Sequence, residues 1–102
     1  METELVYPKF LLHLDGPVLE VMGEDFKGLF RLHVNFCQAS LTPKKHGMLE
    51  MYVDNGGALD RPLLQPKISG SWGLWRFELP ESEESALVDF FTEAERRRVA
   101  PR

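Results

Sequence analysis

The three histidines are the first side chains to test for metal chemistry in this 102-residue chain. His13 and His33 fall on the polar positions of segments that alternate like strands, and His46 falls in a loop. No pair has the i, i+4 helical spacing, or the short strand spacing, that a ligand set needs. We therefore predict no metal site.

Cys37 is the single cysteine, which excludes an internal disulfide and a cysteine metal cluster. A nucleophilic thiol needs a base and an electropositive setting. His33 lies four residues upstream, but a strand corner is predicted between the two and no orienting acid is evident. We expect Cys37 to be a small buried residue at that corner.

Two carboxylate pairs, Glu24-Asp25 and Glu83-Glu84, fall in a predicted turn and in the first turn of a predicted helix. Nothing in the sequence places either pair in a cleft that would shift a pKa toward acid–base catalysis. The glycines form no dinucleotide or P-loop motif. We predict no catalytic residue, no cofactor and no enzymatic activity.

Twelve basic residues stand against sixteen acidic ones, for a formal net charge of −4. Nucleic-acid-binding domains usually carry a basic excess. The basic runs 44–46 and 96–98 are short, and we expect a solvated turn and a solvated helix end. Aromatic residues around Arg76 could stack nucleobases. The net negative charge of the chain argues against nucleic-acid binding, so we expect most of these aromatic residues to lie in the core. We predict no nucleic-acid partner and no membrane insertion, with cytoplasmic residence suggested by the lone thiol.

The positions of these side chains depend on strands that we expect between about residues 5 and 79. Apolar residues alternate from Val6 to Leu14, and a second short strand is expected over 18–22. The turn signal Asp15-Gly16-Pro17 between the two segments predicts a hairpin. A third strand covers 30–36, after which the apolar parity changes. That change predicts a bulge or corner near Phe36-Cys37.

Further strands are expected over 48–54 and within 68–79, and the segment 58–66 is predicted to be a loop or an edge strand. From Pro80 the period changes to that of a helix spanning about 82–98. Its apolar stripe comprises Leu87, Phe90, Phe91 and Ala94. Ser82 is the expected N-cap.

The hydrophobic content of 43% suits one globular domain over residues 1–102. The element order predicts an α+β fold: a small antiparallel β-barrel or sandwich of about six or seven strands, capped by one C-terminal helix.

This order resembles bacterial pleckstrin-homology-like (PH-like) domains. The corner after Phe30-Arg31-Leu32-His33-Val34 and the passage of Trp75-Arg76-Phe77-Glu78-Leu79 into the helix carry the resemblance. It implies a scaffold that binds peptides or proteins. Phosphoinositide-binding members typically have basic residues at the first hairpin loop, where this chain has Asp15-Gly16-Pro17.

We therefore predict a non-enzymatic protein-interaction module that binds another protein or itself. The alternative is a small-molecule or lipid-headgroup binding domain. The predicted partner-binding patch comprises Trp72, Arg76 and Arg31, because an indole on the polar side of a strand suits an interface. In the alternative structural role, Trp72 closes one end of the barrel. Trp75 is assigned to the core.

Overall fold

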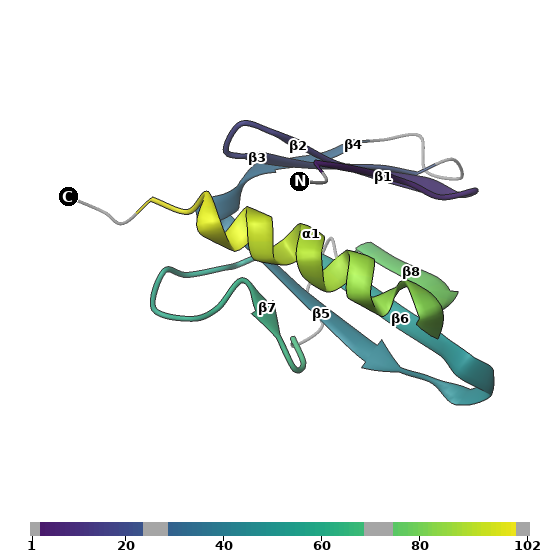
Figure 1. Ribbon diagram of the computed structural model, residues 1–102. Helices are drawn as coiled ribbons and strands as arrows, with labels where there is room; N and C mark the ends of the chain where they lie inside the picture. The colour runs from purple at the N-terminus through teal and green to yellow at the C-terminus, as the bar shows by residue number, and fades with distance from the viewer. Residues whose placement is uncertain (1–2, 24–28, 69–74, 100–102) are drawn as a thin grey trace.

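The computed structural model describes residues 3–23, 29–68 and 75–99. They form two four-stranded sheets and one C-terminal α-helix, which confirms the predicted α+β class. Figure 1 shows the helix α1 running between the sheet of β1–β4 and the sheet of β5–β8.

The first sheet is an antiparallel meander in the order β1-β2-β3-β4. Its strands are β1 (Glu4–Val6), β2 (Phe10–Asp15), β3 (Val18–Gly23) and β4 (Leu29–His33). The predicted hairpin is confirmed as β2–β3, and Gly16 adopts the positive φ of 56° that its turn requires. Pro8, which lacks an N–H, separates β1 from β2.

The second sheet has the order β7-β5-β6-β8. Its strands are β5 (Cys37–Pro43), β6 (Met48–Asn55), β7 (Leu64–Gln65) and β8 (Trp75–Pro80). A 3-10 turn, Val34–Phe36, links the two sheets, and another, Lys45–Gly47, links β5 to β6. The corner that the parity change predicted is therefore confirmed. Phe36 itself is 58% exposed, because the turn rotates it away from the apolar face of β4.

Two details of the predicted architecture change. The described residues form eight strands, since Pro8 divides the first predicted strand and Leu64–Gln65 adds a short parallel strand to β5. These strands make two separate sheets rather than one closed barrel. Of the two predicted architectures, the described part of the chain therefore adopts the sandwich.

The helix α1 spans Glu84–Arg96, after a 3-10 turn at Glu81–Glu83. The predicted N-cap is wrong: Ser82 lies inside the 3-10 turn, and Glu83 precedes the first α-helical residue without a side-chain capping bond. The predicted apolar stripe is confirmed. Leu87, Phe90, Phe91 and Ala94 are all fully buried.

The inner faces of both sheets and the stripe of α1 form one hydrophobic core. Aromatic rings connect the two sheets, because Phe10 of β2 stacks on Phe77 of β8 with centroids 4.2 Å apart. Cys37 is buried as predicted, and its Sγ lies 3.4 Å from the backbone oxygen of His33. Burial raises the pKa of this thiol to about 12, so it stays protonated near neutral pH.

Of the three arginines at the end of α1, Arg96 is exposed as predicted, whereas Arg97 and Arg98 correct the prediction of a solvated helix end. The Arg98 side chain is only 6% exposed and donates to the backbone oxygens of Ala58 and Arg61. Arg97 donates to the backbone oxygen of Gly16 in the β2–β3 turn and to the buried carboxylate of Glu93. These hydrogen bonds connect the end of the helix to the β2–β3 turn of the first sheet and to the loop before β7 of the second sheet. Among the described residues, no helix has the length and apolar character needed to cross a bilayer.

Truncating Phe90 to alanine should lower the free energy of unfolding by about 3–5 kcal/mol, because it removes a fully buried ring from the centre of the core. Val88→Ala is the control, since Val88 lies on the same helix and is exposed. Urea denaturation measures both. Equal, small effects of the two substitutions would contradict the packing described for α1.

Acid should destabilise the protein through Glu93. Hydrogen bonds from Arg96 and then Arg97 lower the pKa of Glu93 from 4.5 to about 2. A carboxylate whose pKa is lower in the folded state contributes stability above its unfolded pKa and loses it as the pH falls through the folded value. Glu93→Gln should therefore flatten the fall of the melting temperature between pH 4.5 and 2. The exposed control Glu81→Gln should leave that slope as it is in the wild type.

Candidate functional site

The outer face of the first sheet carries Arg31, one of the predicted partner-binding residues. Its guanidinium lies 3.2 Å from Glu20 and 3.6 Å from Asp15. Glu20 also contacts the ring of His13 at 2.8 Å. The strand register places Glu4, His13, Glu20 and Arg31 in one row across the four strands.

A second row on the same face is entirely apolar. Val6 pairs with Leu11, Leu11 with Met22, and Met22 with Leu29, so that one aliphatic side chain comes from each strand. Val6, Met22 and Leu29 are 68%, 42% and 48% exposed. We call these four residues the apolar row. The outward face of an antiparallel sheet is usually polar, so a row of four aliphatic side chains is unusual there.

The outer face of the second sheet carries Arg76. The carboxylate of Glu50 is buried there and contacts the Lys44 Nζ at 3.2 Å, the Arg76 Nε at 3.8 Å and the Tyr52 hydroxyl. The hydrogen bond from Tyr52, followed by the two cations, lowers the pKa of Glu50, and the same bond raises the pKa of Tyr52. Glu50 is therefore an ionised anchor that holds the two cations in place.

The structure does not bring the predicted patch together as one surface. Arg31 and Arg76 lie on the outer faces of different sheets. Trp72, the third predicted residue, lies outside the described residues. Trp75 is partly buried against the core, as predicted, with its ring 6.2 Å from that of Phe30.

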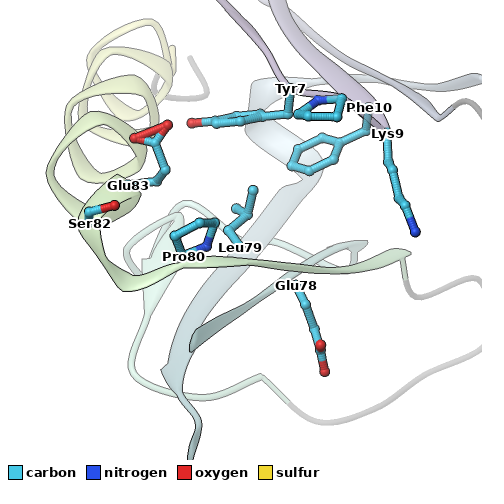
Figure 2. Close-up of a pocket in the computed structure, with 9 residues that line it drawn as sticks. Tyr7, Lys9, Phe10, Glu78, Leu79, Pro80, Ser82 and Glu83 are labelled. Atoms are coloured by element: carbon cyan, nitrogen blue, oxygen red, sulfur yellow. The ribbon is translucent and has the colours of Figure 1, made fainter. Parts of the chain in front are cut away.

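A cavity of about 450 Å³ opens where the β1–β2 connection meets the start of the helical segment (Figure 2). Tyr7 and Pro8 of the β1–β2 connection and Phe10 of β2 line one side of it, and Leu79 and Pro80 of β8 line the other. In Figure 2 the hydroxyl of Tyr7 points toward the carboxylate of Glu83, whereas Lys9 and Glu78 extend away from Tyr7.

The Tyr7 hydroxyl is buried and has no hydrogen-bond partner among the described residues. Burial, and then the charge of Glu83, raises the pKa of Tyr7. The phenol is therefore neutral near pH 7 and keeps a donor and an acceptor available to a molecule in the cavity.

Within the described ranges, His, Cys, Asp and Glu do not gather in groups of three that could hold a metal ion. The ring of His33 accepts a hydrogen bond from the Asn35 backbone at 3.1 Å, which gives it a role in the corner between the sheets.

The comparisons with known proteins found no matching family model, curated protein or solved structure.

Two features of these surfaces were not predicted from the sequence. Leu11 and Met22 occupy outward-facing positions of their strands, where a polar residue is usual. An apolar residue at such a position was the one sign of this row in the sequence. The alignment of Val6, Leu11, Met22 and Leu29 in one row depends on the register of four strands, which the sequence pattern does not predict. The Glu50 cluster gave a weaker signal, a charged residue between the apolar positions Leu49 and Met51.

Tyr7→Phe should leave the free energy of unfolding unchanged or raise it, because it removes a buried hydroxyl that has no partner. Tyr52→Phe is the matched control. It removes a hydroxyl that donates to Glu50 and should cost about 1 kcal/mol or more. A clear loss of stability in Tyr7→Phe, measured by urea denaturation, would show that the hydroxyl is already satisfied in the folded chain.

Proposed function

We propose that this chain is a non-enzymatic protein-interaction module, and that the surface it uses is the outer face of the first sheet. The observation that carries the proposal is the apolar row, which crosses all four strands beside a row of ionisable side chains. Exposed aliphatic groups gain most from burial when they form one continuous strip. We further propose that the sandwich and its helix are a PH-like scaffold that resides in the cytoplasm.

The occupant that fits this face is a second copy of the chain. Two sheets that pack face to face about a two-fold axis parallel to their strands place β1 of one protomer opposite β4 of its partner. Val6 then faces Leu29, and Leu11 faces Met22, so that the apolar row covers itself.

The same symmetry matches the charges of the neighbouring row. Glu4 of one protomer faces Arg31 of the other, and His13 faces Glu20. Both pairs bring a basic group to an acidic one, and the two-fold axis creates each pair twice. Charge matching of this kind selects the orientation of an interface as well as adding affinity. Arg31 keeps the partner-binding role that the sequence predicted.

A small-molecule function is the second candidate, and the Tyr7 hydroxyl favours it. The cavity of Figure 2 is mostly apolar, and the unpartnered hydroxyl of Tyr7, a lining residue, points toward Glu83 on the same lining. That combination suits an apolar ligand with one hydrogen-bonding group. Such a ligand would bind Tyr7→Phe more weakly than wild type, and a screen in which both proteins bind every ligand equally would contradict this candidate.

Sedimentation velocity over a range of concentrations tests self-association. The wild-type chain should form a dimer, and Met22→Glu should be a folded monomer because it places a charge at the centre of the apolar row. Val88→Glu, which changes an exposed apolar residue on α1, should remain dimeric. A wild-type chain that stays monomeric at every concentration would overturn the proposal.

A charge exchange tests the orientation. Glu4→Arg and Arg31→Glu should each weaken the dimer, and the double variant should recover it. These residues lie on opposite edge strands of one sheet, about 14 Å apart at three strand spacings, so recovery reports a contact between protomers. A double variant that is weaker than both single variants would contradict the arrangement.

A further inference from the structure

A second cavity, of about 540 Å³, lies on the outer face of the second sheet. All three charged side chains that line it are cationic: Lys44, Lys67 and Arg76. This local excess stands out in a chain whose formal net charge is −4. The remaining lining residues are Ser40, Thr42, Tyr52, Pro66 and Ile68.

Ser40 supplies an independent observation. Ser40 is 1% exposed and lines the cavity. Its hydroxyl has no hydrogen-bond partner among the described residues. The register sets Ser40, Tyr52 and Arg76 side by side on three neighbouring strands. A buried hydroxyl without a partner costs free energy, and a ligand atom that accepts its hydrogen bond recovers that cost.

The cationic side chains that line the cavity with Ser40 have hydrogen-bond donors that their contacts with Glu50 do not use. Glu50 binds Lys44 and Arg76 but does not line the cavity. A lysine has three N–H donors and an arginine has five, so one contact to Glu50 leaves most of them available. In the part of the chain that the structure describes, Lys67 makes no ion pair.

We infer that this cavity binds an oxyanion, the phosphate or carboxylate group of a small molecule, between Lys67, Arg76 and the hydroxyl of Ser40. Charge-assisted hydrogen bonds of this kind are stronger than neutral ones. The size of the cavity suits a small molecule, and the net negative charge of the chain repels an extended polyanion such as nucleic acid or an anionic membrane. The site lies on the sheet that does not carry the apolar row, so it is independent of self-association.

Titration of the ¹⁵N-labelled full chain by NMR tests the site. Inorganic phosphate and acetate are the two probes, each added at constant ionic strength by replacement of chloride. Saturable shifts should gather at the amides of Ser40, Thr42 and Lys67. Stronger binding of phosphate assigns a phosphorylated ligand, and stronger binding of acetate assigns a carboxylate. Shifts that do not saturate, or that spread over surface lysines, would overturn the inference.

Three variants sharpen the result. Lys67→Ala should weaken binding of the preferred probe by about tenfold or more, whereas Lys45→Ala, an exposed lysine outside the cavity lining, should bind like wild type. Ser40→Ala should also bind more weakly while its melting temperature stays equal to that of wild type or rises. Equal affinities in all three variants would show that the shifts are non-specific and overturn the site.

Discussion

The burial of one helical stripe between two sheets is the constraint on which the rest of this structure depends. Phe90 and Phe91 are fully buried and meet edge to face, with their centroids 5.4 Å apart. Each sheet covers only one of its faces in this core. The arginine run that follows the helix then fixes its end by hydrogen bonds to carbonyl oxygens of the β2–β3 turn and of the loop before β7. The helix therefore contributes its apolar stripe to the core that both sheets share.

Both inner faces are used by the core, so apart from the cavity at the β1–β2 connection the surfaces left for binding are the two outer faces, and these differ. The first presents an aliphatic strip that water solvates poorly. The second presents cations held by the buried carboxylate of Glu50. Burial of that carboxylate is possible because Tyr52, Lys44 and Arg76 all bond to it. The scaffold thus has an exposed aliphatic strip on one side and a recess lined by cations on the other.

Local patterns in the sequence predicted the elements well and their long-range contacts poorly. The alternation from Val6 to Leu14, the turn signal at 15–17, the parity change before Cys37 and the helical stripe ending at Ala94 depend on residues close together in the chain. Arg98 was misjudged as solvated because its acceptors are backbone carbonyls of the distant loop 58–61, which no side-chain pattern reveals. The apolar row was missed for a related reason, since it exists only once four strands adopt one register.

We propose that the outer face of the first sheet packs against a second copy of itself, and contacts between protomers test this most directly. An NMR sample that mixes ¹³C-labelled and unlabelled chains reports, through isotope-filtered NOEs, only methyl groups that meet across an interface. We expect cross-peaks between Val6 and Leu29 and between Leu11 and Met22, pairs that the proposed two-fold axis brings together. A dimer whose intermolecular cross-peaks come instead from α1 or from the second sheet would contradict it.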